Sequence, residues 1–176
     1  MKLQSKRLTF IRYTDSHFEE YKLQAMDYEV MKFISGKAAT EEEAKEKWQK
    51  IMTANSMDDI LGYYSVRRAE DNEVLGLAKL VYYGSEKGLT KGKETGTVEV
   101  GYSLFSEFWG KGYASEITKF FTEFAKGFND VKEVIAIINP ENGASRRVLE
   151  KCGYTLYSTE LFNGTSPSEW YRIKLK

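Results

Sequence analysis

Apolar and polar positions follow two successive periods in the middle of the chain. From Thr97 to Leu104 they alternate, which predicts a strand with one buried and one polar face. Over residues 113–128 apolar side chains recur at helical spacing, which predicts an amphipathic helix. A short loop that holds Gly110, Lys111 and Gly112 lies between them. The pattern therefore predicts a strand, a loop and a helix in that order.

A second strand and a second helix follow this helix. Residues 134–138 are all apolar, which is typical of a short buried strand. A strand, a crossover helix and a further strand imply a parallel pair in a right-handed unit. Asn139 and Pro140 then predict the start of a helix, because proline suits the first helical position. Gly153, directly after Cys152, predicts its end.

The remaining segments predict an antiparallel sheet with helices at its faces. We expect strands over 6–13, 60–68, 74–83, 154–161 and 169–175, and a mobile loop over 84–96. One helix is predicted from Asp15 or Ser16 to about Tyr28, and another behind a capping box formed by Thr40 and Glu43. The predicted fold class is α+β: a mixed, mostly antiparallel sheet with one parallel pair near its middle, helices on both faces, and a single domain over residues 1–176.

Composition excludes several function classes. The chain has 176 residues, with 26 Lys and Arg against 26 Asp and Glu, so it lacks the basic excess of a non-specific nucleic-acid binder. No apolar run reaches a membrane-spanning length of about 18 residues, and the first residues lack the apolar core of a signal peptide. One histidine and one cysteine argue against a zinc site and a disulfide framework. We therefore expect a soluble cytoplasmic protein without a metal.

The glycine-containing loop predicts an anion site. Backbone N–H groups converge at a helix N-terminus, where the helix dipole favours negative charge, and glycine removes the Cβ atoms that would hold a phosphate away. No GxxxxGK[ST] run is present, which excludes a P-loop. A dinucleotide fingerprint needs a third glycine, where this chain has Ser115, and a carboxylate after the next strand, where it has Asn139. A coenzyme A diphosphate remains, although a plain strand-to-helix turn would use the same glycines.

Two sequence blocks resemble a known family. They are VEVGYSL followed by WGKGYASE at residues 98–104 and 109–116, and NPENGASRRVLEKCGY at residues 139–154. In this order and spacing they resemble the GNAT N-acetyltransferases, most of all the branch that acetylates the N-termini of ribosomal proteins. Lys6, Arg7 and Leu8 are similar to that branch's first strand. The resemblance implies the GNAT acyltransferase fold, with a splayed central strand pair, and acetyl-CoA as co-substrate.

The loop and the second block supply the expected acetyl-CoA contacts. We expect the two parallel strands to separate beyond Leu104, so that free backbone groups bind the pantetheine arm and the N–H of Leu104 or Phe105 polarises the thioester carbonyl. The resemblance assigns Asn142 to the pantetheine arm, and Arg146 or Arg147 would meet the 3′-phosphate. The full predicted set is Leu104, Phe105, Trp109, Gly110, Lys111, Gly112, Tyr113, Ala114, Ser115, Asn139, Asn142, Ser145 and Arg147.

Glu99 and Ser145 are the predicted catalytic residues. Glu99 lies on the polar face of the alternating strand, where a carboxylate can take the proton of the attacking amine, although a solvent-facing carboxylate would fit the same pattern. The family often has a tyrosine as general acid seven residues after the asparagine of the second block; this chain has Leu149 there. In the branch that the chain resembles, a serine corresponding to Ser145 is a proposed substitute. Trp109 also departs from the family pattern, which has Gln or Arg at that position.

Two alternatives stay open at this level. The missing tyrosine favours a non-catalytic acyl-CoA-binding regulatory module, whereas Glu99 and Ser145 favour an enzyme. The acceptor of an enzyme is a primary amine, either on a small molecule such as a polyamine or an antibiotic, or at a protein N-terminus. Glu41, Glu42 and Glu43 would suit a polyamine, but they also complement the dipole of their own helix. A homodimer is compatible with the sequence, which carries no signal for oligomeric state.

Overall fold

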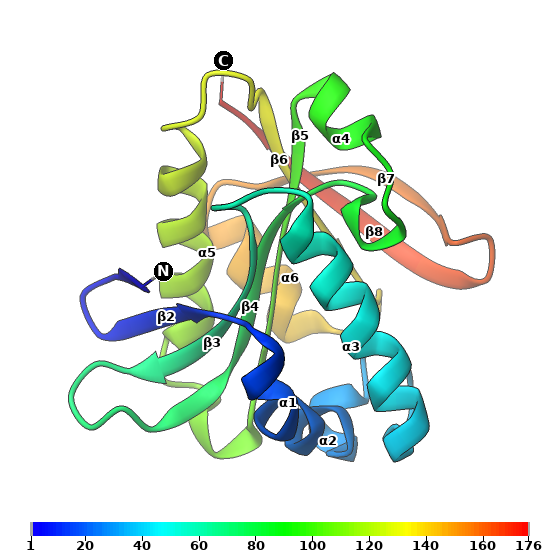
Figure 1. Cartoon of the computed structure of the whole chain (residues 1–176). Coiled ribbons are helices and arrows are strands. Elements are labelled where there is room, and N and C mark those ends of the chain that lie inside the picture. Colours follow the sequence, from blue (N-terminus) through cyan, green and yellow to red (C-terminus); the bar gives the residue numbers. More distant parts are fainter. Residues whose placement is uncertain (1, 176) are drawn as a thin grey trace.

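The structure is a computed structural model that describes residues 2–175, and its strands form one mixed sheet (Figure 1). The spatial order is β1-β2-β3-β4-β5-β6-β8-β7, and only β5 and β6 pair in parallel. The strands are β1 (Lys2–Gln4), β2 (Leu8–Arg12), β3 (Gly62–Arg68), β4 (Val74–Tyr82), β5 (Thr97–Leu104), β6 (Glu133–Ile138), β7 (Thr155–Phe162) and β8 (Ser166–Lys174). The predicted fold class is confirmed.

Helices cover both faces of the sheet (Figure 1). They are the 3-10 helices η1 (Asp15–His17), η2 (Ser85–Lys87) and η3 (Ser106–Phe108), and α1 (Phe18–Ala25), α2 (Tyr28–Met31), α3 (Glu41–Ser56), α4 (Lys91–Thr95), α5 (Tyr113–Ala125) and α6 (Gly143–Lys151). On one face, Ile117 and Phe121 of α5 pack on Val98 and Val100. On the other, Trp48 of α3 lies in a second apolar cluster with α1 and the strands β3 and β4. The sheet therefore separates two cores.

Local signals fixed several element boundaries. Strand β5 has the predicted bounds, and Thr40 caps α3: its hydroxyl accepts from the Glu43 N–H at 3.2 Å, while the Glu43 carboxylate accepts from the Thr40 N–H at 2.9 Å. Gly153 follows α6 with φ +86°, a conformation that suits glycine after a helix. Short-range periodicity and capping chemistry were sufficient for these elements.

Three predictions of secondary structure need correction. Asn142, not Asn139, is the N-cap of α6, and Asn139 instead accepts a bond from the Glu141 N–H in the turn before the helix. The helix expected over 15–28 is divided into η1, α1 and α2. The segment 84–96, expected to be a mobile loop, contains η2 and α4, and the side chain of Glu86 in η2 is bound to Lys79 of β4 at 2.7 Å.

The parallel pair opens earlier than expected. Strands β5 and β6 are in register only at Thr97–Glu133, Val98–Val134 and Glu99–Ile135. Beyond Glu99, β5 continues to pair with β4 and β6 continues to pair with β8, so the twisted sheet divides into two halves. The expected opening beyond Leu104 is therefore wrong by five residues. The last part of β5 presents one edge without a strand partner.

Candidate active site

Two adjacent hollows lie beside the opening between β5 and β6. The larger, which we call the groove, has a volume of about 490 Å³ and extends from the loop at 109–115 to the outer side of α6. The smaller, which we call the splay cavity, has about 90 Å³ and lies between the separated strands. The residues that line both are Phe33, Ile34, Tyr102, Asn142 and Ser145. A long, thin ligand in the groove would reach the splay cavity past these five side chains.

The glycine-containing loop forms the far end of the groove. Gly112 is the N-cap of α5 with φ +79°, and Gly110 has φ +71°, so both adopt a left-handed conformation that other residues rarely take. A Cβ on Gly110 would meet no atom within 4 Å, so the backbone is open to a ligand there. Trp109 closes the loop by donating its indole N–H to the Leu104 carbonyl at 2.8 Å. This is the arrangement that binds phosphate at a helix N-terminus.

Most of the predicted loop residues line the groove. They are Leu104, Trp109, Gly110, Gly112, Tyr113, Ala114 and Ser115. Lys111 does not line it: its side chain is exposed, with the ammonium 5.6 Å from the ring centre of Phe108. The side chain of Lys111 therefore contributes nothing to the groove wall, where the start of α5 and its backbone amides border the groove instead.

Arg7 holds the loop from the opposite side, a role that the sequence did not indicate. Its guanidinium donates to Glu116 at 2.7 Å and to the Lys111 carbonyl at 3.0 Å, and lies 4.5 Å over the ring of Tyr113. Burial opposes the charge of Glu116, but the Arg7 N–H, the Ser5 hydroxyl and the Arg7 guanidinium bind the carboxylate and lower its pKa. Both residues stand in the quoted motifs, but they are 109 positions apart, so no local pattern in the sequence indicates that they pair.

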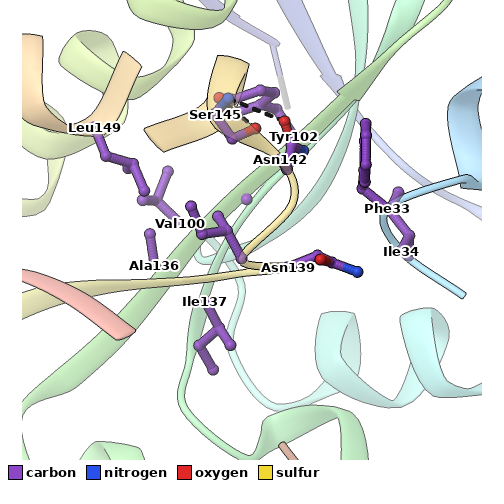
Figure 2. Close-up of a pocket in the computed structure, with 12 residues that line it drawn as sticks. Phe33, Ile34, Val100, Tyr102, Ala136, Ile137, Asn139, Asn142, Ser145 and Leu149 are labelled. Carbon is purple, nitrogen blue, oxygen red and sulfur yellow. Dashed lines mark hydrogen bonds between the residues drawn. The ribbon is translucent and has the colours of Figure 1, made fainter. Parts of the chain in front are cut away.

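The first turn of α6 forms one wall of the splay cavity, as Figure 2 shows. Asn142, Ser145 and Leu149 share one helix face and all line the cavity, as their spacing predicted. The Asn142 side chain accepts from the Ser145 N–H at 3.1 Å and so caps the helix. The Tyr102 hydroxyl from β5 donates to the Ser145 hydroxyl at 3.2 Å. Asn139 lines the splay cavity but not the groove.

The two arginines of α6 have different surroundings. Arg146 makes two bonds to the Glu169 carboxylate, at 2.7 and 3.0 Å, and one to the Pro140 carbonyl at 2.7 Å. Arg147 lines the groove, and Lys151, one helical turn further, lines it as well. Of the two arginines expected at a 3′-phosphate, only Arg147 lies in the groove wall, and Lys151 is a second cation that the sequence analysis missed.

The backbone amides at the end of β5 point to opposite edges. The Phe105 N–H donates to the Leu75 carbonyl at 3.0 Å, so it belongs to the ladder with β4 and is not available to a thioester. Successive residues of a strand alternate in direction, so the N–H groups of Leu104 and Tyr102 face the edge from which β6 has separated. The prediction that the Phe105 N–H could polarise the thioester carbonyl is therefore wrong. The N–H of Leu104 has a direction that is compatible with this role.

Glu99 lies on the other face of the sheet from Tyr102 and lines neither cavity. One ammonium, that of Lys79, binds Glu99 at 2.8 Å and Glu86 at 2.7 Å, and Tyr63 donates to Glu86 as well. Burial raises the pKa of Glu99, and Lys79 offsets only part of this rise. The structure therefore does not bring the two predicted catalytic residues together, and it places Glu99 in a buried ion-pair cluster rather than toward solvent.

Two absences complete the description of residues 2–175. No helix in this part of the chain is long and apolar enough to cross a membrane. The same residues contain no group of three or more His, Cys, Asp or Glu side chains placed to hold a metal ion.

Comparisons with known proteins agree with this geometry. The model of the acetyltransferase (GNAT) domain matches residues 7–155. The chain is 27% identical over 153 residues to the uncharacterized N-acetyltransferase YnaD of Bacillus subtilis, covering 87% of this chain and 82% of that protein. It is 29% identical over 158 residues to the FsC-acetyl coenzyme A-N(2)-transacetylase of Aspergillus fumigatus, covering 89% of this chain and 66% of that protein.

Structural similarity covers almost the whole chain. The structure of RimL, a ribosomal L7/L12 alpha-N-protein acetyltransferase in complex with coenzyme A, aligns with a TM-score of 0.76 at 16% identity, over 99% of this chain and 98% of that one. At this identity the likeness shows the fold. The domain match, in contrast, covers most of the sequence. The chain therefore belongs to the GNAT acetyltransferases, a family of acetyl-CoA-dependent acyltransferases.

Proposed function

We propose that the protein transfers an acetyl group from acetyl-CoA to a primary amine, by direct attack of the amine in a ternary complex. The observation that carries this proposal is that the groove, which begins at the open N-terminus of α5, shares five lining residues with the splay cavity in the opening beyond Glu99. Together the two hollows offer an anion site at one end and a narrow cavity between strands at the other. Their shape suits a long thioester that carries a diphosphate.

The groove supplies complementary chemistry along the length of acetyl-CoA. Amides around Gly110 and Gly112 would hold the diphosphate, with Arg147 and Lys151 as cations on the facing helix. The open edge of β5 would hydrogen-bond the pantetheine amides as an added strand does. The N–H of Leu104 would then stabilise negative charge on the thioester oxygen. The scheme uses only backbone amides and side chains of the protein, and it assigns no role to a metal ion.

Glu99 is the proposed base for the acceptor amine. An alkyl ammonium has a pKa of about 10.4 and must lose its proton before attack, whereas a protein N-terminus, at about 7.7–8.0, is partly neutral already. Glu99 is the last residue of β5 that pairs with β6, so the opening starts directly after it. Because its side chain lines neither hollow, it would take the proton of the amine through a water molecule. The Ser145 hydroxyl would hydrogen-bond the departing thiolate. The acceptor is either a small-molecule amine or a protein N-terminus.

Calorimetry with coenzyme A tests the binding half of the proposal. Gly112→Glu places a carboxylate and a strained φ at the anion site, and we expect no measurable affinity for coenzyme A. Gly164→Glu is the matched control, because Gly164 also has a positive φ, +73°, and its Cβ would meet open space away from the groove. Equal affinity of wild type and Gly112→Glu would refute the assignment of the groove.

Thiol release from acetyl-CoA with a panel of polyamines, aminoglycoside-type amines and peptides tests the catalytic half. We expect acceptor-dependent release with at least one class. Tight binding of acetyl-CoA with no release on any acceptor would instead identify a non-catalytic acyl-CoA-binding module.

The pH dependence of the rate tests Glu99. Because burial raises its pKa, the carboxylate forms at a higher pH than an ordinary glutamate, and the rate should rise with pH as it forms. Glu99→Gln should remove this rise and slow transfer to alkyl amines more than transfer to a peptide N-terminus. A pH profile that Glu99→Gln leaves unaltered would exclude Glu99 as the base.

A further inference from the structure

The position on α6 where the family often has an acidic tyrosine holds an apolar side chain in this chain. Leu149 is 1% exposed and lines the splay cavity from α6, so the position of the family's tyrosine holds a side chain without a proton donor. A phenol reaches the same helix face from another element. Tyr102 projects from β5 toward α6, and its hydroxyl meets Ser145, one helical turn before Leu149 (Figure 2).

Tyr102 and Ser145 stand where the groove and the splay cavity join. Both residues line both hollows, so a ligand that runs from the groove into the opening passes them. The strand periodicity directs Tyr102 to the face of the sheet that carries α5 and α6, which is also the face of the groove. This hydroxyl pair is therefore on the path of the thioester, whereas Glu99 is on the opposite face.

The hydrogen bond between them leaves one donor for a ligand. The Tyr102 hydroxyl donates to Ser145 Oγ, and the Ser145 backbone N–H is taken by the Asn142 cap. Among residues 2–175, no protein acceptor takes the Ser145 hydroxyl hydrogen. With one lone pair of Oγ occupied by the phenol, the hydroxyl hydrogen is available to an acceptor other than Tyr102, such as a ligand where the two hollows meet.

We propose that Tyr102 is a positioning residue for acetyl transfer: its phenol fixes the Ser145 hydroxyl so that this hydroxyl donates to the departing coenzyme A sulfur. The inference rests on the proposed function and names the group that compensates for Leu149. When the tetrahedral intermediate collapses, the carbon–sulfur bond breaks and the electron pair stays on sulfur, where the Ser145 hydrogen bond stabilises it. An alkyl ammonium loses one proton before attack and a second one from nitrogen as the amide forms. One of these protons neutralises the thiolate through solvent and the other is released, which balances the reaction.

Burial keeps the phenol in its donating form. It raises the pKa of Tyr102 to about 12, so the hydroxyl stays protonated throughout the working range of pH. Hydroxyls that bond in series also polarise one another, which strengthens the donor presented by Ser145. Tyr102 thus acts as a constant donor to Ser145 and does not itself titrate during turnover.

The thiol pKa of bound coenzyme A tests the inference without an acceptor. The pKa is measured by following the ultraviolet absorbance of the thiolate as pH is raised. The same titration with a bound coenzyme A analogue that lacks the thiol gives the background to subtract. A hydrogen bond from Ser145 favours the thiolate, so the pKa of the thiol in the wild-type complex should be lower than that of the free thiol. An unperturbed cysteine thiol, for comparison, has a pKa of about 8.5. Tyr102→Phe should raise the bound pKa by about one unit, a tenfold change in the ionisation equilibrium. Ser145→Ala should raise it by at least as much.

The double variant and a matched control separate positioning from folding. If Tyr102 acts through Ser145, Tyr102→Phe should change nothing further in a Ser145→Ala background, and kcat should fall about tenfold in each variant with affinity for coenzyme A unchanged. Tyr154→Phe removes a buried phenol that bonds the Thr122 hydroxyl at 2.6 Å, away from both hollows, and should leave thiol pKa and kcat unchanged.

Two results would overturn the inference. One is an unchanged thiol pKa in Tyr102→Phe, and the other is additive effects of Tyr102→Phe and Ser145→Ala, which would mean that Tyr102 does not act through Ser145. Failure of the proposed function has a different signature: no amine is acetylated although coenzyme A binds and its thiol responds to the variants.

Discussion

The Arg7–Glu116 pair gives the most quantitative prediction about the anion site. Glu116 lies in the first turn of α5, close to where a diphosphate would bind, and its charge is compensated by the Arg7 guanidinium at 2.7 Å. Arg7→Ala removes this positive charge but leaves the carboxylate, which the Arg7 backbone N–H and the Ser5 hydroxyl still hold in place. The variant therefore exposes a bound diphosphate to an uncompensated negative charge.

The size of the effect follows from Coulomb's law. For charges roughly 8 Å apart at an effective dielectric constant of about 40–80, one pair interacts by about 0.5–1 kcal/mol. Two phosphate charges give about 1–2 kcal/mol, which corresponds to an affinity for coenzyme A lower by about 5–30-fold. Because the pair is partly exposed, the loss should shrink with added salt.

Isothermal calorimetry of coenzyme A binding at low and high salt measures this loss. The double variant Arg7→Ala, Glu116→Gln should recover most of the affinity, since it removes the charge that Arg7 compensates. Arg172→Ala is the matched control: Arg172 faces Glu133 at 3.9 Å and lies 4.7 Å over the ring of Tyr157, outside both hollows. We expect wild-type affinity for the control.

The double variant decides between charge and geometry. If Glu116→Gln restores nothing in the Arg7→Ala background, the electrostatic reasoning is wrong. The bond from Arg7 to the Lys111 carbonyl would then be what orients the loop.

Three further predictions concern stability. Thr40→Ala removes one half of a capping box and should lower the free energy of unfolding by about 1 kcal/mol in a denaturant titration. Gly76→Ala should cost more than about 3 kcal/mol in the same titration, because its Cβ would lie 2.1 Å from the Ser103 carbonyl oxygen at φ +156°; a loss below about 1 kcal/mol would contradict this geometry. Because Glu116 has a lowered pKa in the folded protein, the stability that its ionised form contributes is present above about pH 4.3 and lost as pH falls, so wild type and Glu116→Gln should converge in thermal melts at low pH.

Much of the fold was predictable because its signals are local. Alternation set the bounds of β5, a capping box set the start of α3, and the helix spacing of Asn142, Ser145 and Leu149 placed all three on one face. The glycine loop was recognisable for the same reason, since a helix start and two permissive residues lie within a few positions of each other. In each case the decisive interactions span only a few residues.

What the sequence left undecided depends on contacts between distant segments. Arg7 and Glu116 are 109 positions apart and Tyr102 and Ser145 are 43 apart, so no periodicity connects them. The place where β5 and β6 separate is set by their continued pairing with β4 and β8.

The chain by itself therefore determined most of the elements, the family motifs and the glycine-containing loop before α5. Only the tertiary structure decided that Glu99 is bound by Lys79 on the face away from Ser145 and that Tyr102 meets Ser145 at the opening. The physical reason is that a strand's own period selects the face of each side chain, whereas the twist and register of the whole sheet select its neighbours.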